Sequence, residues 1–74
     1  MNATVIRLAV FSAPFLPFTL KMNDDREFYI RHPELISVAP THVFLIDDKT
    51  ARGIFLEPAL IASLQQDEER SSAG

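Results

Sequence analysis

The side chains best suited to catalysis or metal binding are two histidines and two pairs of adjacent aspartates. His32 continues the inward alternation of Phe28 and Ile30, which predicts that it lies at the rim of the core. There a histidine can act as a general base, a metal ligand or a pH-sensitive group, but it more commonly donates a hydrogen bond to a backbone carbonyl. His42 lies ten residues later, without the close helical spacing of a zinc site, so we expect no bound metal.

Nucleophilic catalysis finds no support in the sequence. Ser12, Ser37 and Ser63 lie outside any Gly-x-Ser-x-Gly motif, and two glycines cannot form a phosphate-binding loop. The absence of cysteine excludes a disulfide and a thiolate metal site. We therefore expect a protein that is not an enzyme and carries no cofactor.

The stretch from Phe18 to His32 predicts a β-hairpin. Apolar and polar residues alternate on both sides of "NDD", as in half-buried strands. A two-residue loop would place Leu20 opposite Tyr29, whereas a three-residue loop of residues 23–25 pairs apolar residues with each other. The register expected from the longer loop pairs Phe18 with Ile30, Thr19 with Tyr29, Leu20 with Phe28 and Lys21 with Glu27.

The turn itself accounts for the aspartate pair at positions 24 and 25. The third residue of such a loop is left-handed, a conformation that glycine prefers and that Asn and Asp tolerate. Asp25 holds this position, and aspartate side chains at turns accept hydrogen bonds from nearby backbone N–H groups. The pair thus needs no catalytic explanation.

Residues 2–12 predict a short N-terminal helix, although their β-branched residues also permit a strand. Asn2 or Thr4 can cap the helix, Pro14 ends it, and Arg7 is its single charge. Apolar side chains cover most of its circumference. A chain this small cannot easily bury all of them.

Residues 18–64 predict an antiparallel sheet of about five strands, strongly bent or closed into a small open β-barrel. After the hairpin, extended segments are expected at 35–40, 42–47 and 51–57. Gly53 indicates a bulge or a close backbone approach, and residues 59–64 fit either a strand or a helical turn.

The fold class expected is α+β, mostly β. Residues 1–64 form a single small domain, and the polar residues 65–74 form a disordered tail. The formal charge of −3 counts against a general nucleic-acid binder. The apolar N-terminal run is interrupted by Pro14 and Pro17, which argues against a signal peptide and against a bilayer span of about 20 residues. We expect a cytoplasmic protein without membrane contact.

Residues 14–40, "PFLPFTLKMNDDREFYIRHPELISVAP", combine Pro-Phe-x-Pro-Phe, Asp-x-Arg, His-Pro-Glu and Val-x-Pro. This combination resembles small uncharacterised bacterial proteins, in which Asp-Gly-Arg stands at the turn. The chain departs from their pattern at Asp25, where they have glycine, and at Ala13, where they often have arginine. The resemblance supports the fold and implies no activity. The matching residues are Pro14, Phe15, Pro17, Phe18, Asp24, Arg26, Phe28, Ile30, His32, Pro33, Glu34, Val38 and Pro40.

The apolar helix carries the first functional hypothesis. A hydrophobic interface centred on Val5, Leu8 and Phe11 would cover the helix in a homodimer or against a protein partner. The sequence therefore predicts a non-catalytic protein-interaction or regulatory module that self-associates.

The outer face of the hairpin carries the alternative. Lys21, Tyr29 and Arg31 combine an aromatic ring with cations, as a Sm-like small barrel does when it binds single-stranded nucleic acid. Glu27 interrupts this face, and its pairing with Lys21 is the ordinary surface explanation. Nucleic acid is thus the less favoured partner.

Overall fold

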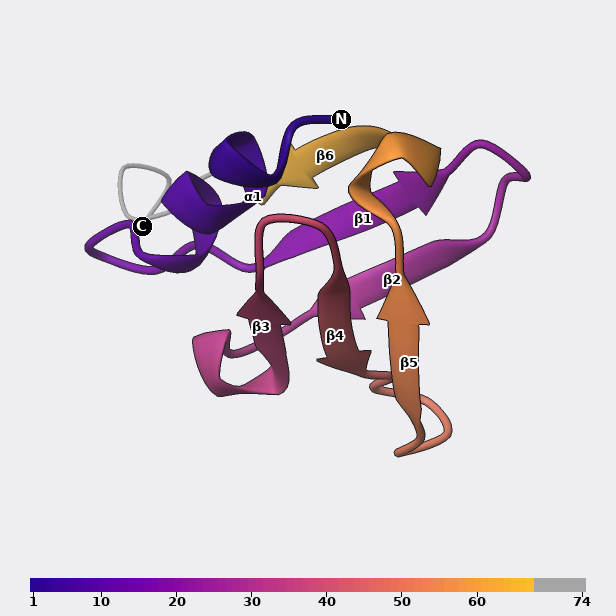
Figure 1. The fold of residues 1–74 in the computed structure, drawn as a ribbon. Coiled ribbons are helices and arrows are strands. Elements are labelled where there is room, and N and C mark those ends of the chain that lie inside the picture. The colour runs from indigo at the N-terminus through magenta and orange to yellow at the C-terminus, as the bar shows by residue number, and fades with distance from the viewer. Residues whose placement is uncertain (68–74) are drawn as a thin grey trace.

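The computed structural model describes residues 1–67 of the 74-residue chain. One short helix precedes six strands, which form two antiparallel sheets (Figure 1). The predicted class, α+β and mostly β, is confirmed; the strands number six among these residues and divide into two sheets. The elements are α1 (Ala3–Val10), β1 (Phe18–Met22), β2 (Glu27–Ile30), β3 (Ile36–Val38), β4 (Val43–Ile46), β5 (Gly53–Leu56) and β6 (Ile61–Gln66), with 3₁₀ turns at Pro33–Leu35 and Pro58–Leu60.

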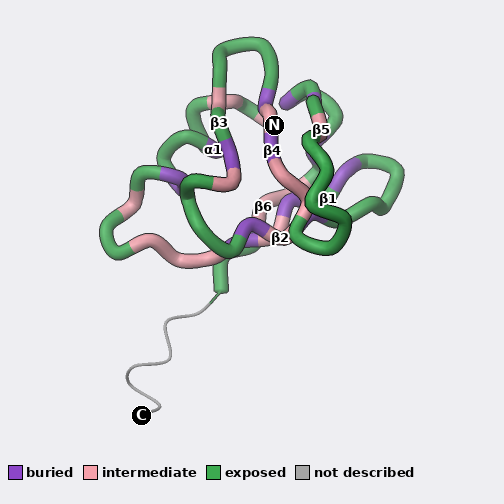
Figure 2. The backbone as a smooth tube through the Cα atoms, turned by 90° about the horizontal axis from the view of Figure 1, so that it is seen from below, coloured by how far each residue is buried: buried purple, intermediate pink, exposed green. Residues whose placement is uncertain are grey.

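The two sheets have the strand orders β2-β1-β6 and β3-β4-β5. Strands of one sheet run across those of the other, and α1 lies beside β3 and the end of β6 (Figure 1). Buried stretches of both sheets and of α1 lie in the interior, while most loop residues are exposed (Figure 2). The sheets therefore cover one another, and α1 closes one end.

Helix α1 begins where the sequence predicts. The side-chain oxygen of Asn2 accepts a hydrogen bond from the backbone N–H of Thr4 at 2.7 Å, which satisfies one of the free N–H groups at a helix start. Ile6, Ala9 and Val10 are buried, at the i, i+3, i+4 spacing of one helix face. The helix ends at Val10, two residues before the predicted end, and Phe11 donates its N–H to the carbonyl of Arg7 at 3.0 Å.

The hairpin of β1 and β2 has the register that the sequence predicts. All four cross-strand pairs, from Phe18 with Ile30 to Lys21 with Glu27, are confirmed. Asp25 has a φ of 73°, and its N–H donates to the carbonyl of Met22 at 3.0 Å. Asp24 accepts hydrogen bonds from the backbone N–H of Arg26 at 3.2 Å and from its Nε at 2.9 Å. Turn chemistry therefore explains both aspartates.

Gly53 allows a close approach, but the group that approaches is an aromatic ring. A Cβ built on Gly53 would lie 2.7 Å from Cζ of Phe44, which is diagonal to it across β4 and β5. The pairing of these strands has no bulge at Gly53. The register shift lies between Lys21 and Met22, where β1 pairs with β6.

The last segment combines both structures that the sequence leaves open. Pro58–Leu60 is a 3₁₀ turn, and Ile61–Gln66 forms β6, which pairs with β1. Strand β6 thus extends two residues into the segment predicted as a disordered tail, and the N–H of Asp67 donates to the carbonyl of Pro17 at 2.8 Å. The prediction is therefore wrong for residues 65–67. The remainder of that prediction, residues 68–74, lies outside the described residues.

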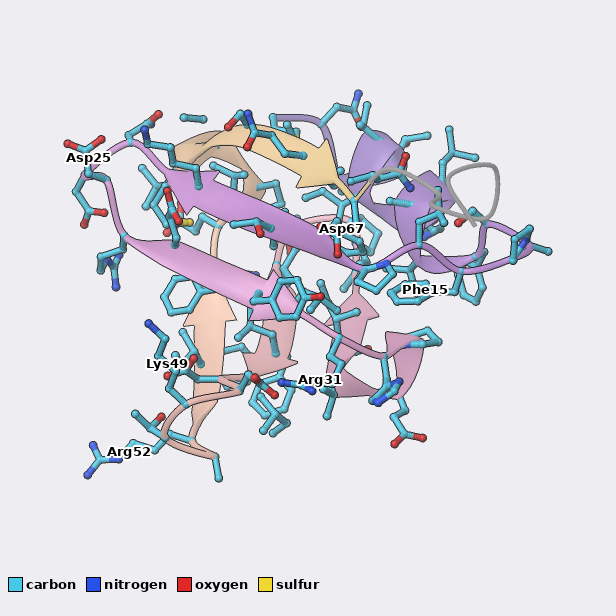
Figure 3. All side chains as sticks on the ribbon, turned by 180° about the vertical axis from the view of Figure 1, so that it is seen from behind. Phe15, Asp25, Arg31, Lys49, Arg52 and Asp67 are labelled. Carbon is cyan, nitrogen blue, oxygen red and sulfur yellow. The ribbon has the colours of Figure 1, made fainter. Side chains whose placement is uncertain are left out.

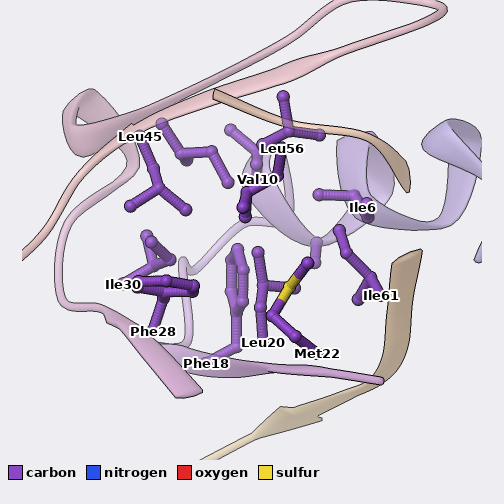
Figure 4. Close-up of a cluster of buried hydrophobic side chains, with 13 residues drawn as sticks. Ile6, Val10, Phe18, Leu20, Met22, Phe28, Ile30, Leu45, Leu56 and Ile61 are labelled. Carbon is purple, nitrogen blue, oxygen red and sulfur yellow. The ribbon is translucent and has the colours of Figure 1, made fainter. Parts of the chain in front are cut away.

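A single cluster of apolar side chains joins α1 to both sheets (Figure 4). No polar or charged residue among residues 1–67 is buried. No helix in this part of the chain is long and apolar enough to cross a membrane. The cluster consists of Ile6, Ala9, Val10, Phe18, Leu20, Met22, Phe28, Ile30, Ile36, Val43, Leu45, Leu56 and Ile61.

Candidate functional site

The outward side of α1 carries three large apolar side chains exposed to solvent. Val5, Leu8 and Phe11 are 47%, 68% and 76% exposed, and they follow one another at intervals of three residues. This spacing places them on consecutive turns, away from the face that Ile6 and Val10 bury. We refer to Val5, Leu8 and Phe11 as the α1 face. The sequence singled out these three residues, and the structure places all of them at the surface.

An open groove of about 270 Å³ runs between α1 and β6. Its lining is mostly apolar, and the hydroxyl of Ser12 donates to the carbonyl of Ala9 at 3.0 Å. A polar group that is already hydrogen-bonded does not oppose the entry of an apolar side chain. The groove can therefore receive an apolar side chain from a partner. Its lining residues are Val5, Leu8, Ala9, Ser12, Leu64 and Gln66.

The α1 face has little charge to desolvate. Arg7 is the single charged residue of α1, and its Nη2 donates to the carbonyl of Val38 in β3 at 3.3 Å. The guanidinium is thereby held toward sheet β3-β4-β5. Burying an unpaired charge is costly. Because the guanidinium of Arg7 points away from the α1 face, a partner can contact the apolar side chains without burying this charge.

The alternative face at Lys21, Tyr29 and Arg31 is brought together by the hairpin. The guanidinium carbon of Arg31 lies 6.0 Å from the centre of the Tyr29 ring, and Thr19 pairs with Tyr29 while Lys21 pairs with Glu27. The hairpin therefore places Lys21 and Tyr29 on its outer face, with Arg31 beside Tyr29.

Each polar side chain of this face nevertheless already interacts with a carboxylate of the same chain. Arg31 Nη2 lies 2.9 Å from a carboxylate oxygen of Asp48, and Lys21 Nζ lies 3.7 Å from Asp25. The hydroxyl of Tyr29 donates to Asp67 at 3.1 Å (Figure 3). The hydrogen bond to Asp48 raises the pKa of Arg31, and the hydrogen bond to Asp67 raises the pKa of Tyr29 above its ordinary value of 10.0.

A cleft of about 290 Å³ lies beside this face. Three carboxylates and one ammonium group line it together with Thr19 and Tyr29, so its net charge repels phosphate. Sequence reasoning missed this feature because Asp47 and Asp48 belong to the β4–β5 turn, far along the chain from β2. The charged lining residues are Glu27, Asp47, Asp48 and Lys49.

The two histidines do not form a site. His32 is exposed at the start of the Pro33–Leu35 turn, and its side chain does not cap that turn. The prediction that His32 points inward is wrong, because β2 ends at Ile30 and its alternation ends with it. Thr41 Oγ1 lies 3.0 Å from Nδ1 of the exposed His42. Residues 1–67 contain no cluster of three His, Cys, Asp or Glu residues that could hold a metal.

Sequence reasoning also missed Phe55, which is 73% exposed on β5. Its ring centre lies 4.9 Å from that of Phe44, on the outer face of sheet β3-β4-β5. Gly53 and Phe55 alternate with Ile54 and Leu56, and this alternation indicates that Phe55 lies on the face opposite to Leu56. An apolar run alone does not show which of its faces is covered.

The sequence matches no protein-family model, and comparison with curated proteins and with solved structures finds no significant similarity. The resemblance to small bacterial proteins with the Asp-Gly-Arg turn therefore stays a prediction.

Proposed function

We propose that this protein is a non-catalytic protein-interaction or regulatory module that self-associates through the α1 face. The observation that carries the proposal is the exposure of Val5, Leu8 and Phe11 together on one side of a short helix. Contiguous exposed apolar side chains are typical of protein contact sites.

Burial of this face gives a free-energy gain large enough to matter for association. Phe11 is 76% exposed, so its burial would remove on the order of 150 Å² of surface from water. Full burial of a side chain of this kind contributes about 1.5–3 kcal/mol before the cost of association. Leu8 and Val5 add to this gain.

A second copy supplies the apolar side chains that the groove beside α1 can receive. In a two-fold arrangement, Leu8 or Phe11 of each copy would enter the groove of the other, which makes the contact self-complementary. Helix α1 contains no acidic residue, so two such helices meet without buried carboxylates. These features favour a homodimer as the simplest assembly.

The test is the solution mass, measured by light scattering over a concentration series for the wild type and for Leu8→Glu. We expect a wild-type dimer and a shift of the Leu8→Glu variant toward monomer, because the new carboxylate would be desolvated in the contact.

Leu60→Glu is the matched control for this experiment. Leu60 is 49% exposed on the 3₁₀ turn that precedes β6, outside the α1 face. This control variant should have the same solution mass as the wild type at each concentration. A wild-type monomer at every concentration, or equal dissociation by both substitutions, would contradict the proposal.

A further inference from the structure

Strand β5 has a free edge on one side of sheet β3-β4-β5 (Figure 1). The N–H of Asp47 donates to the carbonyl of Arg52 at 2.8 Å, so these two residues face each other in a hydrogen-bonded pair. In an antiparallel ladder such pairs alternate with non-hydrogen-bonded pairs, here Ile46 with Gly53 and Phe44 with Phe55. The backbone N–H and C=O groups of Gly53 and Phe55 therefore point away from β4, toward the free edge.

Apart from its short length of four residues, the β5 edge lacks the features by which edge strands usually avoid pairing. Gly53–Leu56 contains no charge and no proline, and its pairing with β4 has no bulge. On its outer face the exposed Phe55 packs against Phe44. The edge is thus a short apolar strand with unpaired backbone groups.

The edges of β3 and β6 lie against α1, and the end of β2 lies beside the β4–β5 turn. Arg7 donates to the carbonyl of Val38 at the edge of β3, and α1 contacts that strand. Asp48 binds Arg31 beside the end of β2. Leu64 and Gln66 of β6 line the groove at α1. Strand β5 is the edge that these contacts leave open.

Opposite charges flank the β5 edge. Arg52 directly precedes the strand and Glu57 directly follows it. No ion pair among residues 1–67 includes either side chain, and Arg52 projects away from the tip of the β4–β5 hairpin (Figure 3). An antiparallel copy of the same strand would bring the positive end of one β5 to the negative end of the other.

We propose that β5 pairs antiparallel with β5 of a second copy of this chain, which joins two three-stranded sheets into one of six strands. The free N–H and C=O groups of Gly53 and Phe55 form the new hydrogen bonds. In the register that pairs Gly53 with the partner's Phe55, Arg52 lies one residue from the position opposite the partner's Glu57, so the two charged groups meet at the ends of the paired strands and are not directly opposed. The partner is a second copy of this chain because the terminal charges and the unpaired backbone groups of one β5 edge complement those of another.

This contact is separate from the α1 face and does not depend on it. A copy that uses both two-fold surfaces can bind two neighbours, so assembly then continues beyond a dimer at high concentration. The β5 contact alone is small compared with the roughly 800 Å² per partner of a stable interface. It therefore forms at higher concentration than a standard dimer.

The test uses the full chain with Leu8→Glu, so that the α1 face no longer contributes. We expect residual self-association, measured by sedimentation at rising concentration. Glu57→Lys or Arg52→Glu alone should weaken it about five-fold, because each places like charges at both ends of the pair. The double substitution Arg52→Glu/Glu57→Lys should restore it.

Amide hydrogen exchange supplies an independent measurement on the same protein. The N–H of Phe55 should become protected as the concentration rises, while the amides on the α1 face of the Leu8→Glu protein should not. Absence of residual association, failure of the double substitution to restore it, or concentration-independent exchange at Phe55 would each overturn the β5 contact. The comparison of the wild type with Leu8→Glu tests the α1 face alone, and the measurements on the Leu8→Glu protein test the β5 contact alone. Either proposal can therefore be wrong while the other is right.

Discussion

Asp25 shows how one residue sets the geometry of a hairpin. Its φ of 73° is left-handed, and this allows the three-residue loop that places Leu20 opposite Phe28. An aspartate tolerates this conformation less well than glycine does. The turn thus stores strain that a single substitution can relieve.

Asp25→Gly should raise the free energy of unfolding by about 0.5–1 kcal/mol, because relief of the left-handed strain exceeds the entropy that glycine adds to the unfolded chain. Urea unfolding measures the change. Asp24→Gly is the matched control and should destabilise the protein, since Asp24 accepts hydrogen bonds from Arg26. Equal loss of stability in both variants would count against strain at Asp25.

Tyr29 should titrate above its ordinary pKa of 10.0, because its hydroxyl donates to Asp67 and that carboxylate disfavours the phenolate. Tyr29 is the single tyrosine of a chain without tryptophan, so phenolate absorbance reports on it directly. Asp67→Asn should lower the pKa toward 10.0, whereas Asp25→Asn, which removes the same charge elsewhere, should not.

The stability linked to this hydrogen bond has a defined pH window. The pKa of Tyr29 is higher in the folded protein than in the unfolded chain, so the folded state holds the proton more tightly. The contribution is fully present below pH 10.0 and is lost as the pH rises through the raised pKa. A wild type and an Asp67→Asn variant whose stabilities fall in parallel above pH 10.0 would exclude this linkage.

At the scale of elements, α1 combines a buried face with an exposed one. Ile6, Ala9 and Val10 attach the helix to the core, and this attachment presents the α1 face to solvent. A helix of eight residues is marginal by itself in water. Its cap and its buried face must therefore both contribute to its stability.

Asn2→Ala should lower the free energy of unfolding by about 1 kcal/mol, because the N–H of Thr4 loses its acceptor at the helix start. Thermal unfolding, followed by circular dichroism, measures the loss. Asn23→Ala is a control of the same residue type in the exposed β1–β2 loop and should change stability by less than about 0.5 kcal/mol. A similar loss in both variants would mean that the Asn2 cap is not the cause.

At the scale of the whole molecule, one apolar cluster connects α1 and both sheets. Residues 1–67 bury no charged or polar side chain, so specific packing rather than a polar network defines the arrangement of the sheets. Leu20 is fully buried in this cluster, as are Phe18 beside it and Leu45 in the other sheet. Loss of one such side chain affects every element that the cluster touches.

Leu20→Ala should lower the free energy of unfolding by about 2–5 kcal/mol through lost burial and a residual cavity. For a chain of 74 residues the total is on the order of 4–11 kcal/mol, so this loss is a large fraction of the stability of the protein. Urea midpoints measure the loss, and Leu60→Ala, at a half-exposed position, should cost far less. Two variants of equal stability would show that Leu20 is not part of the common core.

Local patterns were sufficient for the β1–β2 hairpin and for the start of α1. The alternation of residues 18–30, the turn residues and the Asn2 cap all act between neighbours in the chain, so the sequence predicts register and capping correctly. The exposure of Val5, Leu8 and Phe11 was foreseen for a related reason, since a helix that is apolar on most sides cannot bury all of them in so small a protein.

Contacts between distant segments needed the tertiary structure. The division into two sheets, the outward position of His32 and the pairing of Arg31 with Asp48 and of Tyr29 with Asp67 depend on where each strand ends and what packs beside it. The same holds for the open edge of β5, because strand order decides which backbone groups are left unpaired. Residue spacing specifies local geometry, whereas burial and charge pairing across the fold are properties of the packed whole.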